Sequence, residues 1–326
     1  MNEKERKILA NKIIYHIPPQ HNAATYLMDH LNISRESAYR RLRGEIAFTL
    51  DDIIVLSGRL GFSIDQLIDS TLSNHVLVTL SGDTTTSQED TFVNMLRILY
   101  DAIQAKGKML SDVQVLISLN KLYPFFYASR QHLLKFYYFE WRHQILDTPS
   151  SFHYGDTIVP SRVNEMCRLI SYETLKQSAM RVIVAPNLFV NSLQKVQYYH
   201  ERRLISDNEL RNIKEDLAQI LDEIEADTAR GVTHSGGAFE VYVSSFNVAQ
   251  NSVSILDGKY TKSLFWVDPV NMVSVTNSNF CLVHKRWFDS LKKYSSPISG
   301  CNLAMRNDFF EGQRAAIQCS SMHALP

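Results

Sequence analysis

The stretch from Ile33 to Gly44 constrains this chain most, because it carries the signals for both ends of a short helix. Ser34 is a good N-cap, since its hydroxyl can accept from a backbone N–H one turn further on, and Gly44 tolerates the positive φ of a helix end. Ala38 and Leu42 lie four residues apart, so they share the face that we expect to point inward. The sequence therefore predicts a capped helix whose opposite face is polar and basic.

That outer face would carry an excess of arginine. From Ile33 to Gly44 there are four arginines and one glutamate, a local charge of +3 in a chain whose 34 basic and 34 acidic residues cancel. A local excess on one helix suits contacts with phosphates and with guanine edges in a DNA groove. The residues expected to face base edges are Arg35, Glu36, Ser37 and Arg40, and those expected to contact phosphates are Tyr39, Arg43 and either Arg41 or Thr49.

The segments on either side favour a compact helical domain. Asn22–Leu31 spaces its apolar residues four apart and predicts a helix that a tight connection joins to Ser34. Glu3–Ile17 predicts a first helix, which two prolines end. Thr49 would cap a helix with two aspartates in its first turn, and Ser63 would cap a last short helix. Five helices would fit into about seventy residues.

This order of elements resembles the helix-turn-helix of the Cro and lambda-repressor type, found in the large XRE-like family of regulators. The residues that carry the resemblance are Ile33-Ser34, Arg40, Gly44 and the trailing pattern from Leu50 to Leu56 and from Leu60 to Leu67. The resemblance covers Ile8–Ile68, about a fifth of the chain. It implies an all-α domain that places one helix in the major groove of double-stranded DNA, with two copies on paired half-sites and hence a homodimer.

Two features depart from that family pattern. Arg41 and Leu42 stand in an unexpected order before Gly44. Met1–Ser70 also holds nine Lys or Arg and nine Asp or Glu, so bulk electrostatic attraction to DNA would be weak. A helical domain repurposed for binding proteins therefore stays open as an alternative.

The length of the chain indicates its domain organisation. With 326 residues, of which 45% are apolar, it exceeds a usual single domain. We expect a multidomain protein in which an all-α N-terminal helix-turn-helix domain precedes a larger α+β or α/β region. The expected divisions are 1–72 for the helix-turn-helix domain, 73–88 for a linker, 89–232 for a mainly helical, aromatic-rich region, and 233–326 for a β-rich region with a late helix in the same sensor or dimerisation domain.

The densest aromatic sequence lies between Leu122 and Trp141. One interpretation is a buried helix that packs against its neighbours; the other is a ligand pocket or dimer face lined by Tyr137, Tyr138 and Trp141. The sequence leaves both open. A helix-turn-helix domain followed by such a region resembles a group of regulators from Bacteroidetes whose C-terminal part is uncharacterised, and that resemblance implies no particular ligand.

One long helix is predicted at both of its ends. Ser206 and Glu209 can form a capping box, in which each side chain accepts from the other's backbone, and Gly231 ends the helix. Apolar residues recur between these ends at alternating spacings of three and four. Packing inside the domain and a dimeric coiled coil both fit this apolar seam.

The sequence from Phe239 onward turns β-rich. Asp257-Gly258 predicts a hairpin between two strands, and Asn277 predicts the cap of a later helix. The residues expected on the buried side of that helix are Phe280, Val283, Trp287, Phe288 and Leu291. This order resembles the last part of phospholipase-D-like sensor domains. Their catalytic His-x-Lys signature does not occur in the sequence, so the resemblance implies a sensor without that chemistry.

Motifs for other chemistry do not occur in the sequence. There is no phosphate-binding glycine loop, dinucleotide-binding loop, zinc-protease motif or nucleophile elbow. The four cysteines lack paired spacing and the eleven histidines are scattered, so we expect no metal site, no cofactor and no catalytic residue. The charged N-terminus and the lack of a long apolar run predict a cytoplasmic protein without a membrane partner.

Two functional classes follow from these patterns. The first is a sequence-specific transcriptional regulator, not an enzyme, whose larger region senses a small-molecule effector or pairs subunits. The alternative is a small-molecule enzyme or signalling protein that uses its N-terminal domain to bind other proteins. The salt dependence of DNA binding would separate the two classes.

Overall fold

The structure is a computed structural model, and it describes residues 2–18, 21–60, 62, 76–82, 86–106, 114–144, 148–174, 179–233, 236–257, 260–267, 271–300 and 302–319. The chain divides into two compact units, Met1–Leu77 and Val78–Pro326. The boundary falls inside the predicted linker, 73–88. Residues 79 and 80 of that linker form a strand that pairs within the second unit, so the second unit begins earlier than predicted.

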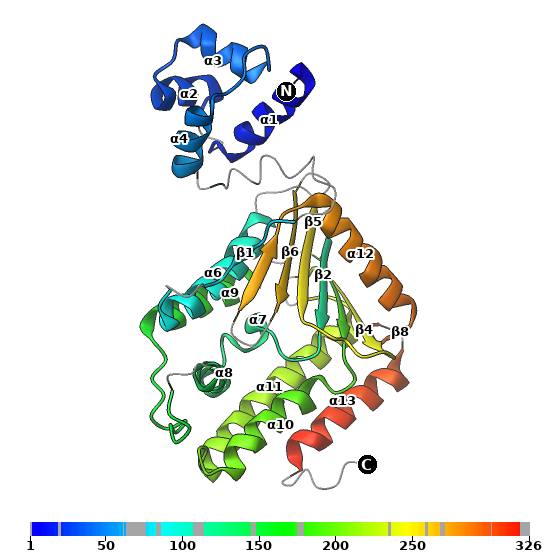
Figure 1. Cartoon of the computed structure of the whole chain (residues 1–326). Helices are drawn as coiled ribbons and strands as arrows, with labels where there is room; N and C mark the ends of the chain where they lie inside the picture. Colours follow the sequence, from blue (N-terminus) through cyan, green and yellow to red (C-terminus); the bar gives the residue numbers. More distant parts are fainter. Residues whose placement is uncertain are drawn as a thin grey trace. The chain divides into compact units, whose positions relative to one another are not determined.

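The described part of the first unit consists of helices and their connections (Figure 1). The helices are α1 (Glu3–His16), α2 (Ala23–Leu31), α3 (Arg35–Leu42) and α4 (Leu50–Leu60). Their apolar faces meet in one core, whose fully buried members are Ala10, Ile13, Leu27, Ala38 and Leu56. The helix that Ser63 was predicted to cap lies outside the described residues.

Local side-chain caps begin these helices. Asn22 accepts from the backbone N–H groups of Ala24 and Thr25, at 3.0 and 3.2 Å. The predicted cap of α4 is confirmed, because the Thr49 hydroxyl accepts from the Asp52 N–H. The Asp52 carboxylate accepts in return from the Thr49 N–H, which completes a capping box. Signals only a few residues apart therefore set where the helices of this unit start.

The second unit is built on an eight-stranded sheet (Figure 1). The strands are β1 (Thr79–Leu80), β2 (Gln114–Leu119), β3 (Ala179–Val184), β4 (Ala238–Ser244), β5 (Ser252–Asp257), β6 (Tyr260–Trp266), β7 (Met272–Val275) and β8 (Ser295–Pro297). They lie in the order β1-β7-β6-β5-β2-β3-β4-β8. The pairs β2–β3 and β3–β4 are parallel and the other pairs are antiparallel, so the sheet is mixed with a parallel centre.

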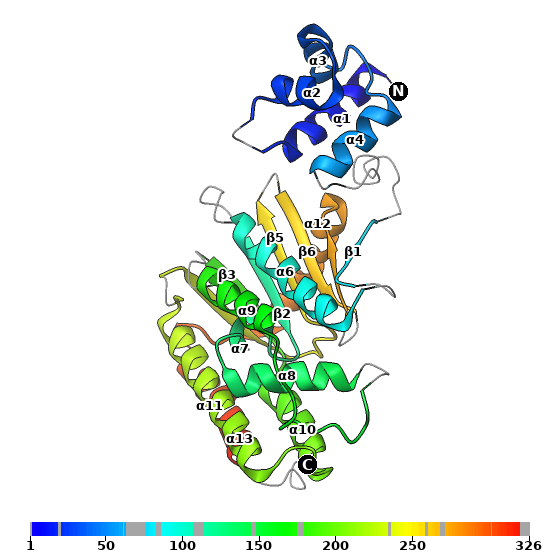
Figure 2. The same ribbon diagram turned by 90° about the vertical axis from the view of Figure 1, so that its left-hand side faces the viewer.

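Helices cover both faces of this sheet. They are α6 (Gln88–Lys106), α7 (Pro124–Tyr127), α8 (Gln131–His143), α9 (Ser161–Thr174), α10 (Leu188–Glu201), α11 (Asp207–Arg230), α12 (Ser278–Lys293) and α13 (Leu303–Gln318). Helix α12 packs on one face, where Phe288 and Leu291 join a cluster with residues of β2, β3 and β5. Figures 1 and 2 show α6 and α9 along the opposite face, and α8, α10, α11 and α13 gathered at one end of the sheet.

The central strands β2 and β3 come from the region predicted to be mainly helical, 89–232. They pair with β5 and β4 from the predicted β-rich region, 233–326. Both regions therefore form one unit, and the coarse fold class, a helical unit followed by a larger unit with a mixed sheet, is confirmed. Every residue of Val115–Leu119 is buried, so this strand lacks the alternation that marks a half-exposed strand.

Two local predictions in the second unit are confirmed. The capping box of Ser206 and Glu209 starts α11, and Gly231 ends it with φ +68°. The apolar seam of α11 faces α8, α10 and α13. Of the two alternatives for this seam, packing inside the unit is therefore the one that the structure shows. The predicted hairpin joins β5 and β6, which pair antiparallel out to Asp257 and Tyr260; the two residues of its turn lie outside the described residues.

One predicted helix face is only partly correct, since Phe288 and Leu291 are buried as predicted. Asn277 caps α12 as expected. Val283 and Trp287, however, are 62% and 40% exposed. The buried residues of α12 are Cys281, Phe288 and Leu291. The helix carries two apolar stripes, and contact with the sheet, which the local sequence does not reveal, decides which stripe is buried.

Candidate nucleic-acid interface

Helix α3 is fixed at both ends. The Ser34 hydroxyl accepts from the Ser37 N–H at 3.2 Å, which confirms the predicted N-cap. Asn32, with φ 53°, adopts the left-handed conformation that ends α2 and leads the chain toward α3. Gly44 has φ +80°, and a Cβ there would lie 2.9 Å from the backbone nitrogen of Lys7. This close approach of α1, together with the positive φ, requires glycine.

One face of α3 is anchored and the other is open. Ala38 is fully buried in the core of the first unit, where α3 contacts α1 and α2. The exposed side chains are Arg35, Glu36, Tyr39, Arg40 and Arg43, as their spacing predicted, and Ser37 is half-buried. The guanidinium of Arg35 lies over the ring of Tyr39, 5.8 Å from its centre. The open face thus combines charge, an aromatic ring and hydrogen-bonding groups.

Arg41 does not take the role of a phosphate contact that the sequence suggested. Its Nε donates to the Asp52 carboxylate at 3.2 Å, and its Nη1 donates to the hydroxyl of Ser37. The side chains of Arg41 and Asp52 are only 11% and 13% exposed. Because Asp52 also caps α4, this ion pair ties α3 to the start of α4. The guanidinium of Arg41 therefore stabilises the position of α3 and of its open face.

Glu45 belongs to this surface, although the sequence analysis did not single it out. Its carboxylate lies 2.7 Å from the Nε of Arg43 and 3.4 Å from the Nε of Arg40. Glu45 therefore holds two of the candidate arginines side by side and reduces the net positive charge of the open face. The signal was present in the sequence, since a carboxylate two residues beyond Arg43 can reach it.

The three aromatic residues proposed for a ligand pocket or dimer face lie in the core of the second unit instead. Tyr137 stacks on Tyr127 with 4.2 Å between ring centres, and its hydroxyl is 2.7 Å from the Ser192 hydroxyl. Tyr138 and Trp141 both pack edge-on against Phe92. Burial raises the pKa of Tyr137 well above its usual value. The space beside Tyr137 and Trp141 measures about 30 Å³, which suits a water molecule and no larger ligand.

The residues that the structure describes contain neither a metal-binding cluster nor a membrane-spanning helix. Among those residues, no group of three or more His, Cys, Asp or Glu side chains is arranged to hold a metal ion. No helix in the described ranges is both long and apolar enough to cross a membrane. The thiols of Cys167 and Cys281 are buried and form no disulfide, and burial raises the pKa of each.

Comparison with known proteins concerns the N-terminal part of the chain. A family model described as the BetR domain matches residues 6–106, which is less than a third of the 326 residues. The match includes α2, α3 and α4 with every residue of the candidate interface, and it extends through α6 of the second unit. No curated protein and no solved structure matches the chain. The chain is thus similar to the BetR domain over its first unit and the first long helix of its second.

Proposed function

We propose that this chain is a sequence-specific DNA-binding regulator of transcription that acts in the cytoplasm as a homodimer. The orientation of α3 carries this proposal. The buried Ala38 fixes one side of the helix, and the exposed Arg35, Arg40 and Arg43 extend from the other. In this proposal α2 and α3 form a helix-turn-helix, and the second unit senses a small-molecule signal or pairs the subunits.

The size and chemistry of α3 suit the major groove. An α-helix with its side chains is about 10–12 Å in diameter, which fits the ~12 Å width of the groove. Arg35 and Arg40 would donate to guanine edges, and Glu36 would accept from cytosine. The Thr49 hydroxyl accepts from the Asp52 N–H at 3.1 Å and keeps its own hydrogen for a phosphate oxygen. Tyr39 and Arg43 would add further phosphate contacts.

A DNA-binding domain of this size needs a second copy of the chain to bind specifically. One short helix contacts only a few base pairs, and known domains of this kind bind two half-sites about 34–36 Å apart. The two-fold symmetry of a homodimer then matches a palindromic operator. We therefore expect selected DNA fragments to contain inverted repeats separated by about one helical turn.

The test begins with selection of bound fragments from a genomic library. Binding of the selected duplex to the full chain, to Arg40→Ala and to Arg59→Ala is then measured by fluorescence anisotropy. Arg40→Ala should weaken specific binding by about 1–3 kcal/mol, which is roughly 5- to 150-fold. Arg59 is exposed on α4 and is not one of the residues of the candidate interface, so Arg59→Ala controls for the loss of one charge. If no fragment is enriched, or if both variants lose affinity equally, the proposal is wrong.

The charge balance of the first unit favours a second candidate function. Met1–Ser70 has equal numbers of basic and acidic residues, and Glu45 partly neutralises the open face of α3. The chain would then be a small-molecule enzyme or signalling protein whose first unit binds proteins. In that case DNA binding is absent or insensitive to salt, whereas a metabolite raises the melting temperature of the chain.

A further inference from the structure

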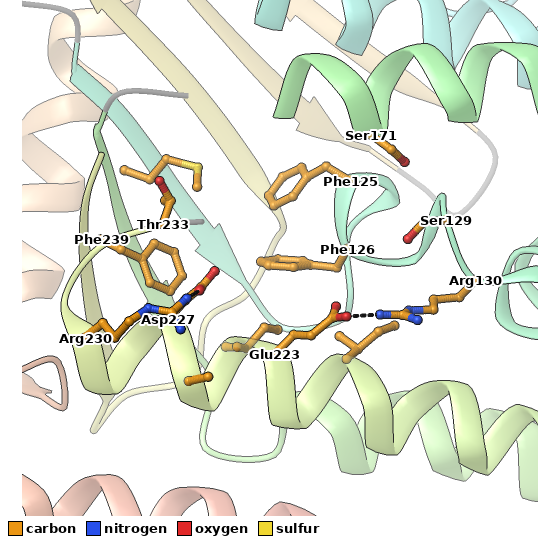
Figure 3. A pocket seen from close by; sticks show the side chains of 14 residues that line it. Phe125, Phe126, Ser129, Arg130, Ser171, Glu223, Asp227, Arg230, Thr233 and Phe239 are labelled. Carbon is orange, nitrogen blue, oxygen red and sulfur yellow. Dashed lines mark hydrogen bonds and ion pairs between the residues drawn. The ribbon is translucent and has the colours of Figure 1, made fainter. Parts of the chain in front are cut away.

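The second unit contains a half-open cavity far larger than the gap beside Tyr137. It has a volume of about 530 Å³ and lies between α7, α11 and the first residues of β3 and β4 (Figure 3). Phe125 and Phe126 of α7 point toward Phe239 of β4 across this space. Ile220 and Ile224 of α11 add further apolar wall. Ligand pockets in proteins commonly have this size and this apolar lining with a few polar groups.

Arg130 stands at one end of the cavity with an unused donor. Its Nη1 donates to Gln219 at 2.8 Å, and its Nη2 pairs with the carboxylate of Glu223. Its Nε is buried and has no hydrogen-bond partner within the part of the chain that the structure describes. Because the Nε of Arg130 has almost no accessible surface, the contact that a ligand can take over is the one between Nη2 and Glu223.

Arg130 is held rigidly, whereas its counter-ion is not. Arg130 is the N-cap residue of α8, and the start of that helix is fixed by Asp216 of α11, whose carboxylate accepts from the Leu133 N–H at 2.8 Å. The Arg130 side chain is 19% exposed, but that of Glu223 is 66% exposed. Glu223 can therefore turn into solvent at little cost, since ion pairs with an exposed partner contribute little.

We propose that this cavity binds a small amphipathic organic anion. Its carboxylate or sulfonate replaces Glu223 and accepts from the Nη2 of Arg130, and its apolar body lies between Phe126 and Phe239. A single negative charge fits, because Arg230 at the other end of the cavity is already paired with Asp227. The inference rests on the proposed function only in giving this ligand the role of the effector.

The first experiment compares two fluorescent probes on the full chain. One is 8-anilinonaphthalene-1-sulfonate, an apolar body with one anionic group, and the other is the neutral N-phenyl-1-naphthylamine, which has the same body without the sulfonate. Arg130→Met should weaken binding of the anionic probe tenfold or more and change binding of the neutral probe less than about twofold. The matched control is Arg211→Met, an exposed arginine of α11 outside the cavity, which should change neither.

Two further variants make the result independent of any loss of folding. Glu223→Gln removes the competing carboxylate, so it should strengthen binding of the anionic probe several-fold and leave binding of the neutral probe unchanged, whereas a partly unfolded chain would bind more of both. Ala226→Trp places an indole at the exposed edge of the cavity and should abolish binding of both probes. The inference is overturned if the wild-type chain binds neither probe, if Ala226→Trp binds both, or if Arg130→Met and Glu223→Gln leave the affinity for the anionic probe unchanged.

These measurements contain no DNA, so their failure differs from failure of the proposed function. If the chain binds an operator but neither probe, the proposed DNA-binding function is supported and the proposed ligand site in the cavity is wrong. If the chain binds the anionic probe through Arg130 but binds no DNA, the proposed ligand site is supported and the proposed regulatory function is wrong.

Discussion

Each unit contains an arginine–glutamate pair, and the two pairs differ in which partner is held. In the first unit Arg40 and Glu45 are both open to solvent, with side chains 47% and 40% exposed. In the second unit Arg130 is mostly buried and its partner Glu223 is mostly exposed. A large partner such as a DNA duplex can reach Arg40 directly. Arg130 lines a cavity of about 530 Å³, a size that suits a small molecule, so the two units suit recognition at very different scales.

The cores behind these pairs also differ. The first unit is held by short helices that follow one another in sequence, with Ala38 at the point where α3 meets the core. The core of the second unit joins segments from Phe92 to Ile317 around the sheet. We therefore expect the units to unfold separately. All three tryptophans, Trp141, Trp266 and Trp287, lie in the second unit, so tryptophan fluorescence reports on that unit alone.

The largest expected effect comes from Ala38→Asp. Burying an unpaired carboxylate costs several kcal/mol, enough to unfold a small helical unit. Circular dichroism should show the loss of helix from the first unit, while the unfolding transition followed by tryptophan fluorescence stays where it was. Ala47→Asp, at an exposed position, is the matched control and should leave both signals unchanged. An equal shift of the tryptophan transition in Ala38→Asp would mean that the two units form one cooperative structure.

A second prediction concerns acid stability of the second unit. Burial against Phe265 and Trp287 lowers the pKa of His284 from 6.5 to about 4. The unfolded chain therefore binds a proton below pH 6.5 that the folded unit excludes, so stability is full above pH 6.5 and is lost as the pH falls toward 4. We expect a loss of about 2–3 kcal/mol from this histidine between pH 7 and pH 4, at roughly 1.36 kcal/mol per pKa unit.

The measurement is urea unfolding followed by tryptophan fluorescence at several pH values. Carboxylates also titrate in this range, so the comparison is between the wild type and His284→Gln, in which the part of the slope due to His284 should disappear. Burial lowers the pKa of His16 in the first unit as well, but that change does not reach the tryptophan signal. Identical pH profiles of the two chains would show that His284 is not protected from protons.

The same contrast between local and distant contacts explains what the sequence could predict. In the first unit, the caps at Ser34 and Thr49, the terminating Gly44 and the open face of α3 all depend on residues a few positions apart, and these predictions agree with the structure. Arg41 was misassigned because its partner Asp52 lies eleven residues away, across the turn into α4. A pattern of charge alone cannot distinguish an arginine that faces solvent from one that joins two helices.

In the second unit the decisive contacts are long-range. Arg130 and Glu223 are 93 residues apart, and Asp216 caps a helix that begins 85 residues before it. No local signal marks these pairs, so the sequence did not predict the cavity. Tyr137 and Trp141 were instead proposed for a pocket or dimer face because the segment around them is rich in aromatic residues. The strand β2 lies in a region predicted to be mainly helical, because a strand covered on both faces does not show the alternation of a half-exposed strand. The positions of these residues depend on how the strands and helices are connected, which the composition of a segment does not reveal.

A third prediction separates two neighbouring arginines of α3. Arg41→Met breaks a mostly buried ion pair and leaves Asp52 without its counter-ion, so the first unit should lose about 1–3 kcal/mol of stability. Arg40→Met removes an exposed pair and should cost less than about 0.5 kcal/mol. Thermal unfolding followed by circular dichroism measures both. Equal destabilisation by the two substitutions would place Arg40, like Arg41, among the residues that hold the unit together.

A gain in affinity of modest size is the most direct test of the comparison between the two pairs. Glu45→Gln releases Arg40 and Arg43 and removes a negative charge from beside the phosphates, so affinity for the selected duplex should rise by up to about 1 kcal/mol, or roughly fivefold. The gain should be largest at low salt and shrink as the salt concentration rises, because exposed charges are screened within about 10 Å at 0.1 M. Glu223→Gln should strengthen binding of the anionic probe in the same way but with little dependence on salt, since Arg130 is mostly buried. If both gains decline equally with salt, the two arginines are equally exposed to solvent. The proposed difference between recognition on an open surface and recognition in a cavity is then wrong.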